Sequence, residues 1–333
     1  MSKPYQYCIH SIHIDMYQAP RTELRRLQRS GGSLVVAVPH AWAKALGLKK
    51  GDPLEARIEG RVLLLLPWKG AQAARRSISL RYAQGQEGAF YNELVAAYLD
   101  GYDDIRISAE KGMAEGARQL IRALTSKLLG LELVEEDGEL LLRVMADASG
   151  LAPEQALRRM HVSTLKMQRW ALEAALGREE PKKVLDEDEV VDRLYFYLVR
   201  LLRGAASDPS LALRLGLSPL RLLDFRVASQ LLEGIGDKAV ALAQAPRLGH
   251  EGEGLLRLLA LLKEGQEQAF GAFLSRDMGR TLAAHETYER ARELAGTLLS
   301  SNRGAELAVV CSLLLDIAGL WVDLADLAGP LRE

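Results

Sequence analysis

The spacing of apolar residues changes along the chain and divides it into four regions. Residues 1–20 show no clear period, and we expect an irregular extension there. Residues 21–70 alternate apolar and polar positions with the period of two that is typical of short strands. Residues 75–148 mix strand and helix patterns, and from Pro153 onward only helical spacing is found. This pattern predicts an α+β multidomain protein.

The second region, 21–70, predicts a small β-rich module with one short helix. The letters GGSLVVAVP indicate a tight turn and then a strand that Pro39 ends, and HAWAKALG indicates two helical turns that end at Gly47. KKGD is typical of a turn, and PLEARIEG with RVLLLLP predicts a hairpin that turns at Gly60.

The first strand of this module is apolar on both faces. One face carries Leu34, Val36 and Val38, and the other carries Val35 and Ala37. A strand of this kind is normally covered on both sides. A module of about 50 residues has too little interior to cover it alone, so we expect a partner chain, and hence a homodimer through this module.

The third region, 75–148, predicts a small α/β domain. Its order is strand, helix, strand, helix, strand, strand, read from RRSISLRY, AFYNELVAAYLDGY, DDIRIS, EGARQLIRALTSKLLG, LELVEED and ELLLRVM. The helices are expected to end at Gly101 and Gly130, and the last two strands to form a hairpin around an Asp-Gly turn.

The fourth region, 153–328, predicts six helices. We expect them at 153–177, 184–204, 220–245, 251–275, 278–300 and 303–327. LLEGIGDKAVALA in the third helix aligns with LLDIAGLWVDLAD in the sixth, and VVDRLYFYLVRLL in the second aligns with TYERARELAGTLL in the fifth. The region therefore predicts two three-helix repeats, 153–245 and 251–327, packed as an all-α bundle.

Charge is unevenly distributed between these regions. The whole chain has a formal net charge of −1, but the segment from Arg21 to Arg76 holds twelve basic and four acidic residues, a net charge of +8. A basic head on an acidic body is typical of a protein that binds a polyanion through one part only.

Three observations predict a cytoplasmic protein. Cys8 and Cys311 are too few and too far apart for a disulfide framework, which favours a reducing compartment. No uninterrupted run approaches the roughly 20 apolar residues of a membrane span. Residues 1–20 lack the basic start and apolar core of a signal peptide. Met16 lies just before the first organised segment, and we expect the natural chain to start there.

The second region resembles the AbrB/SpoVT/MazE family of swapped-hairpin β-barrel modules. The resemblance rests on Arg26, GGSLVVAVP, AWAKALGL, KKGD and RVLLLLP. It implies a dimer of interlaced hairpins that places arginines of the first strand and turn on DNA. Contacts to phosphates and base edges are then expected from Arg25, Arg26 and Arg29, and phosphate contacts from Lys44, Lys49 and Lys50. Alternatively, the arginines form a solvated edge that discourages sheet aggregation.

Two pairs of acids stand out in the helical region. Glu233 and Asp237 are spaced i, i+4 in one predicted helix, as are Asp188 and Asp192 in another, so each pair shares a helix face. Two antiparallel helices that carry such pairs can surround a cation with oxygen ligands. Acids at this spacing are also typical of a solvated face, and acids at a helix start favour the helix dipole.

The same stretches resemble the PhoU-type phosphate-uptake regulators. LLEGIGDKAVALA resembles the E-x-x-x-D signature of that family, and DEDEVVDRLYFYLVRLL resembles its partner helix. The resemblance implies a metal cluster held by Asp188, Asp192, Glu233 and Asp237, with Fe, Zn, Mn or Mg as the ion. The motif is eroded in the second repeat, where a further ion is expected only from His285, Glu289 and Asp316.

The order of regions resembles the archaeal phosphate-uptake regulators, which join an AbrB-type head to a PhoU-type body. This resemblance implies a DNA-binding transcriptional regulator that senses or relays phosphate status, with a transporter ATPase or a signalling protein as partner. The alternative is a protein that dimerises through its head and docks on such a partner without binding DNA. No nucleophile–His–acid grouping, phosphate loop or dinucleotide fingerprint is found, so we expect no enzyme.

Overall fold

The computed structural model describes residues 23–59, 61–68, 75–109, 115–136, 139–145, 150–248, 252–301 and 304–329. The expected extension 1–20, the expected hairpin turn at Gly60 and the expected Asp-Gly turn at 137–138 lie outside these residues. The chain divides into two compact units, Met1–Ala73 and Ala74–Glu333. Each unit is described by itself, and we call the first unit the head.

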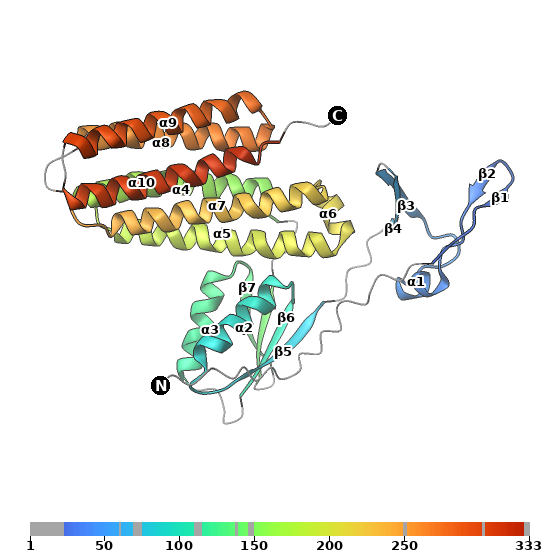
Figure 1. Ribbon diagram of the computed structural model, residues 1–333. Coiled ribbons are helices and arrows are strands. Elements are labelled where there is room, and N and C mark those ends of the chain that lie inside the picture. The colour runs from blue at the N-terminus through green and yellow to red at the C-terminus, as the bar shows by residue number, and fades with distance from the viewer. Residues whose placement is uncertain are drawn as a thin grey trace, which may run out of the picture. The chain divides into compact units, whose positions relative to one another are not determined.

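The head consists of two small hairpins and one short helix (Figure 1). The elements are β1 (Gln28–Ser30), β2 (Ser33–Val35), α1 (His40–Ala45), β3 (Leu54–Glu59) and β4 (Val62–Pro67). β1 pairs with β2, and β3 pairs with β4, both antiparallel. The predicted order of turn, strand, short helix, turn and hairpin is therefore confirmed.

Local backbone chemistry explains the turns of the head. Gly31 joins β1 to β2 with φ of 59°, and Gly47 follows α1 with φ of 66°, values that glycine adopts without steric cost. In the KKGD turn, the backbone N–H of Lys49 donates to Asp52 Oδ2 at 2.7 Å and the backbone N–H of Asp52 donates to the Lys49 carbonyl at 3.1 Å.

The strand predicted to reach Pro39 is shorter than expected. β2 ends at Val35, and residues 36–39 have no strand assignment. Its partner β1 has only three residues, so β1 offers no further hydrogen-bonding edge to β2 within the part of the chain that the structure describes.

The second unit begins with an α/β domain built on a four-stranded sheet in the order β5-β6-β8-β7. β5 and β6 run parallel, and the other pairs are antiparallel. The helices α2 and α3 pack on the sheet and on each other, and the core includes Leu94, Tyr98, Ile105, Ile121 and Leu142. The elements are β5 (Ser77–Tyr82), α2 (Glu87–Leu99), β6 (Asp104–Ala109), α3 (Glu115–Lys127), β7 (Leu131–Glu136) and β8 (Glu139–Val144).

The rest of this unit is a body of long helices (Figure 1). α4, α5 and α7 pack against one another, as do α8, α9 and α10, and α7 packs against α10 to join the two groups. That the two groups are copies of one repeat stays a prediction. The helices are α4 (Pro153–Ala175), α5 (Lys182–Ser207), α6 (Pro209–Leu215), α7 (Pro219–Ala243), α8 (Glu253–Ser275), α9 (Met278–Ser301) and α10 (Ala305–Asp326).

The short helix α6 lies where the sequence predicted only a loop. The Asp208 carboxylate accepts a hydrogen bond from the backbone N–H of Ser210 at 2.8 Å, Pro209 occupies the first turn, and Gly216 ends the helix with φ of 67°. These are ordinary start and stop signals. The sequence analysis placed no helix between 204 and 220, but Pro209 suits the first turn of a helix because its fixed φ matches helical geometry.

One helix among the described residues, α10, is long and apolar enough to cross a membrane by length and composition, with a mean hydropathy of 2.0 over its best window. Counting only uninterrupted apolar runs missed it, because Asp316 and Asp323 interrupt the run. Val310, Leu314 and Trp321 of α10 are buried, and the helix packs against α7, α8 and α9. The core helix of a bundle passes the same test, so this is weak evidence for a membrane span.

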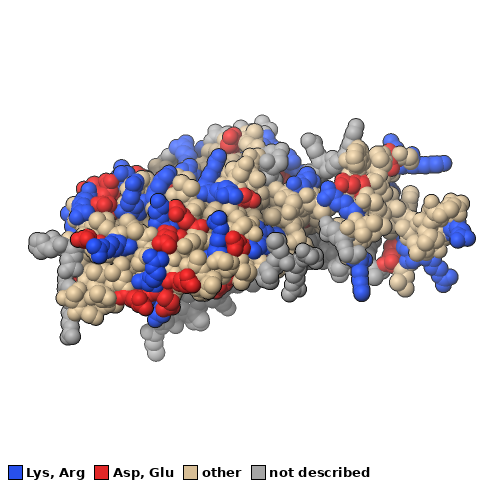
Figure 2. Space-filling model, turned by 90° about the horizontal axis from the view of Figure 1, so that it is seen from above, with Lys and Arg blue, Asp and Glu red and all other residues tan. Residues whose placement is uncertain are grey.

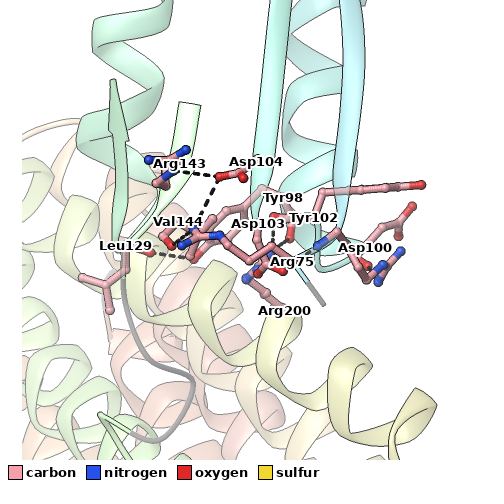
Figure 3. A network of polar contacts seen from close by, with 11 residues as sticks. Arg75, Tyr98, Asp100, Tyr102, Asp103, Asp104, Leu129, Arg143, Val144 and Arg200 are labelled. Carbon is pink, nitrogen blue, oxygen red and sulfur yellow. Dashed lines mark hydrogen bonds and ion pairs between the residues drawn. The ribbon is translucent and has the colours of Figure 1, made fainter. Parts of the chain in front are cut away.

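A network of polar contacts fixes the α/β domain to α5 (Figure 3). Arg200 of α5 donates to the carbonyls of Tyr98 and Tyr102 at 2.6 and 2.8 Å, and to Asp103 Oδ1 at 2.9 Å. Its side chain is only 14% exposed, and burial lowers the pKa of its guanidinium. Arg203 pairs with Asp100 nearby. The sequence analysis did not single out any of these residues.

The start of the second unit joins the same network. The backbone N–H of Arg76 donates to Asp103 Oδ2 at 3.0 Å, so Asp103 binds both this segment and Arg200. Arg75 donates to the Val144 carbonyl at 3.0 Å, and Asp104 accepts from Arg143 at 2.9 Å (Figure 3). The segment at Arg75 and Arg76 is thereby bound to the sheet, and Asp103 links it to Arg200 of α5.

Candidate functional site

The six basic residues expected to contact DNA are all exposed on the head. Arg29 lies in β1, Arg25 and Arg26 precede it, Lys44 lies in α1, and the other two lysines lie in the KKGD turn. Arg25 pairs with Glu23. No described side chain forms an ion pair or a hydrogen bond with the side chains of Arg26, Arg29, Lys44, Lys49 or Lys50.

Apolar side chains of the head are also exposed. Of the head residues whose side chains the structure describes, none is buried. Leu34 is 68% exposed and Ile58 is 81% exposed, and Val62 and Leu63 at the start of β4 are also exposed. Two separate two-stranded hairpins are at best marginally stable in water. A single head therefore presents both unpaired cations and an uncovered apolar surface.

The body shows a different surface. On the face that Figure 2 shows, Lys and Arg side chains are interspersed with Asp and Glu side chains. Such a surface has no single sign of charge to attract a polyanion. The two acid pairs form a local exception to this mixture.

The four predicted acids of the first repeat face one another across α5 and α7. Asp188 and Asp192 lie on α5, and Glu233 and Asp237 lie on α7. A Cβ added at Gly236 would stand 3.2 Å from Asp188 Oδ1, so this glycine lets the carboxylate approach the α7 backbone closely. None of the four acids has a hydrogen bond or an ion pair with any side chain that the structure describes.

Burial raises the pKa values of all four carboxyls. The negative charges of neighbouring carboxylates raise them further for Asp188, Asp192 and Glu233. Burial, followed by the charges of Asp237, Asp192 and Asp188, raises the pKa of Glu233 to about 7. Burial, followed by Asp192 and Asp237, raises the pKa of Asp188 to about 6. The pKa values of Asp192 and Asp237 are raised as well, in both cases mainly by burial. The fold therefore gathers negative charge at a cost in free energy.

The sequence analysis missed the cations at this cluster. The charge of Lys238 lowers the pKa of Asp237, and the charge of Arg226 lowers that of Glu233, each against the effect of burial. Lys127, in the last turn of α3, lowers the pKa values of Asp188 and Asp192 by its charge, against the other effects. Its own placement near α5 follows from the packing of α3 on that helix. No signal in the sequence connects residue 127 with residues that lie more than 60 positions later.

The donor chemistry of the cluster fits a hard or borderline cation, because it offers the oxygens of four neighbouring carboxylates. The side chains as placed are less favourable. No three His, Cys, Asp or Glu side chains of the described residues are arranged so that they could hold one metal ion. A cation at this cluster therefore requires its carboxylates to rotate toward a common point, and the metal site stays a prediction.

The structure does not bring together the three residues expected to hold a second ion. His285 Nε2 lies 2.8 Å from Asp326 Oδ1, Glu289 pairs with Arg292 on the same helix at 3.0 Å, and Asp316 pairs with Lys238 of α7 at 2.7 Å. Each candidate ligand is thus engaged with a different partner. At the positions of α9 that align with the acid pair of α5, residue 285 is a histidine and residue 289 is a glutamate.

Comparison with known proteins identifies one part of the chain. Residues 27–71 match the family described as antidote-toxin recognition MazE, bacterial antitoxin. No curated protein and no solved structure matches the chain. The match begins one residue before β1 and extends past β4, so it covers the described elements of the head. The head is therefore an AbrB/MazE-like module, a kind of domain compatible with binding DNA or another protein.

Proposed function

We propose that this protein is a dimeric DNA-binding transcriptional regulator. The proposal rests on two features of the head. Five exposed cations have no side-chain partner among the described residues, and the same module has an exposed apolar surface that a second head can cover. Interlacing two heads would bury that surface and extend β2 beyond Val35. It would also place two sets of cations on one side of the dimer, as phosphate binding requires.

DNA binding is tested by replacing Arg25, Arg26 and Arg29 together with alanine. Each lost phosphate contact removes about 0.9 from the slope of log affinity against log salt, so we expect a slope less steep by about 3 per head on a short duplex. The control is Arg57→Ala, because Arg57 already pairs with Glu55 at 2.7 Å. Unchanged affinity and slope in a folded triple variant would contradict the proposal.

The proposed regulator binds a divalent or trivalent metal ion on its body. Asp188, Asp192, Glu233 and Asp237 would hold the ion, and Fe, Zn, Mn and Mg are the candidates. A bound cation would neutralise the repulsion that raises these pKa values. Elemental analysis and equilibrium dialysis should show metal in the wild type and loss of it in the Glu233→Ala/Asp237→Ala double variant. The control is Glu286→Ala/Glu293→Ala on the exposed side of α9, which should keep the metal.

Phosphate status is the proposed signal. Its support is the resemblance of the stretches around Asp188 and Glu233 to PhoU-type regulators, together with a body of long packed helices. The relay partner would be a phosphate transporter ATPase or a signalling protein in the cytoplasm. Titration of the metal-loaded protein with inorganic phosphate, and DNA affinity measured with and without phosphate, separate direct sensing from relay.

A second candidate function is a pure interaction protein, which dimerises through the head and docks on a partner without binding DNA. The observation that favours it is the match to a family described by antidote–toxin recognition, a protein–protein contact. Gel-shift titrations over a range of salt concentrations distinguish the two functions. Salt-dependent shifts support the regulator, and no shift at low salt supports the interaction protein. No catalysis is proposed for either.

A further inference from the structure

A shallow groove of about 480 Å³ opens between α4 and α8, the first helices of the two three-helix groups. Its surface is mostly apolar, with Leu165 from α4 and Leu259 and Ala260 from α8. Val162 and Leu256 also line it and are 50% and 39% exposed. On α8 the groove follows the helix for about three turns, or roughly 16 Å at 1.5 Å per residue.

The rim of the groove is basic. Lys166, Arg169 and Lys263 line it, with Glu267 as the one acid among the lining residues. Lys166 lies 3.7 Å from Glu187 and Lys263 lies 3.9 Å from Glu267, both at the outer limit of an ion pair. Arg169 is exposed, and no side chain in the described ranges pairs with it. The rim is therefore complementary to an acidic occupant.

A polar group in the wall of the groove lacks a partner. Gln168 is 1% exposed and lines the groove, and its Nε2 donates to Gln266 Oε1. Gln266 in turn donates to Thr164 Oγ1 at 2.8 Å. Gln168 Oε1 receives no hydrogen bond from any residue that the structure describes. Buried acceptors are normally satisfied, but this oxygen is enclosed in the wall and is not open to the groove, so an occupant of the groove does not depend on it.

We propose that the α4/α8 groove docks an acidic amphipathic helix of a partner protein. An apolar channel open along three turns fits a helix that presents apolar side chains at i, i+4 and i+7. The cations on both walls fit Asp and Glu on the flanks of such a helix, and set which partners bind. The proposal stands independently of DNA binding by the head and of metal binding by the acid cluster.

The test uses the full chain and a phage-displayed library of short helical peptides with randomised surface positions. Enriched peptides should carry an apolar stripe flanked by Asp and Glu. Their affinity for the full chain, measured by fluorescence anisotropy, should fall about tenfold in Val162→Ser and in Arg169→Glu, as expected for residues central to a small interface. A charge-reversed peptide with the same apolar stripe should bind at least tenfold more weakly.

Two matched variants outside the groove control for non-specific effects. Leu220→Ser removes an apolar side chain that is 60% exposed on α7, and Arg214→Glu reverses an exposed charge on α6; both should leave peptide affinity unchanged. The four variants are compared by thermal unfolding, so that loss of folding is recognised. Enrichment of basic or non-helical peptides, or affinity insensitive to Val162 and Arg169, overturns the proposal. Binding of oleate that depends on these two residues, without any enriched helix, also overturns it and assigns the groove to a small amphiphile.

Discussion

At the scale of single residues, the carboxyl of Glu233 lies half-buried on α7, in reach of three other carboxyls. Its raised pKa means that the folded chain disfavours the charged form that water favours at neutral pH. The same residue is one of the expected metal ligands. Its negative charge would therefore favour metal binding, but it destabilises the folded protein when no metal is bound.

Replacing Glu233 with Gln should stabilise the metal-free protein. The change removes one negative charge from the cluster, and we expect a gain of about 1 kcal/mol at pH 8 after allowing for solvent screening of a half-exposed group. Urea unfolding in the presence of a chelator measures it. Glu286→Gln on α9 is the control and should change little. A loss of stability in Glu233→Gln would show that the carboxylate makes a favourable contact instead.

His161 behaves as a core residue of the body. Its ring stacks on Phe270 at 4.2 Å between centroids, and its Nδ1 lies 3.2 Å from Gln266 Nε2. Burial, with a smaller effect from the charge of Arg158, lowers the pKa of His161 to about 4. The sequence analysis made no functional use of this residue.

The stability of the protein should therefore depend on His161 in mild acid. The unfolded chain binds a proton at this histidine below about pH 6.5, whereas the folded chain does so only below about pH 4. The contribution is complete above pH 6.5 and is lost as the pH falls toward 4, by about 3 kcal/mol. Comparing the wild type with His161→Gln over this range measures it. Parallel pH profiles for the two proteins would refute the assignment.

At the scale of elements, glycines in the long helices have two different roles. In α8, a Cβ added at Gly265 would lie 2.4 Å from Cη2 of the buried Trp321, so this glycine lets α8 and α10 pack closely. In α9, a Cβ added at Gly296 would meet no atom within 4 Å in the described residues, apart from the adjoining backbone of the helix itself. The sequence pattern predicts a helix at both glycines and does not tell them apart. Only the packing of the helices shows that they differ.

Alanine at these two positions should have opposite effects. Gly265→Ala should destabilise the protein by about 2 kcal/mol or more, because overpacking forces the Trp321 ring to move. Gly296→Ala should stabilise it by about 0.5–1 kcal/mol, because alanine is the better helix former. Paired denaturant unfolding curves test both. Similar signs for the two variants would contradict the close packing of α8 on α10.

At the scale of the whole molecule, Arg200 joins the α/β domain to the helical body within the second unit. One guanidinium contacts two carbonyls and one carboxylate of that domain, from a helix that also carries Asp188 and Asp192. The helix α5 therefore carries both two residues of the acid cluster and the main polar link to the α/β domain.

Replacing Arg200 with Met should loosen this junction. The substitution removes three hydrogen bonds of a mostly buried guanidinium and leaves their acceptors without a donor. We therefore expect the free energy of unfolding to fall by about 2–4 kcal/mol. Arg203→Met is the control. Arg203 is 56% exposed and, among the described residues, pairs only with Asp100, so its loss should cost less than about 1 kcal/mol. Calorimetry should show the larger effect at Arg200, and equal effects would argue against a buried junction.

Much of the fold could be predicted from local patterns. The glycines at 47, 101, 130 and 177 end elements or precede new ones with positive φ, and the strands of the α/β domain fall where alternation placed them. These features depend on neighbours within a few residues, and the sequence displays those directly. The i, i+4 spacing likewise placed each acid pair on one helix face.

The tertiary structure decided what lies opposite each face. It set Asp188 against Gly236, placed Lys127 beside the acids, divided the three candidate ligands of the second repeat among separate ion pairs, and joined α4 to α8 beside a groove. Contacts of this kind join residues far apart in the chain, and their distances depend on how whole helices pack. Local preference in the sequence therefore determined the elements and the charge of the head, and long-range packing alone determined which charges meet.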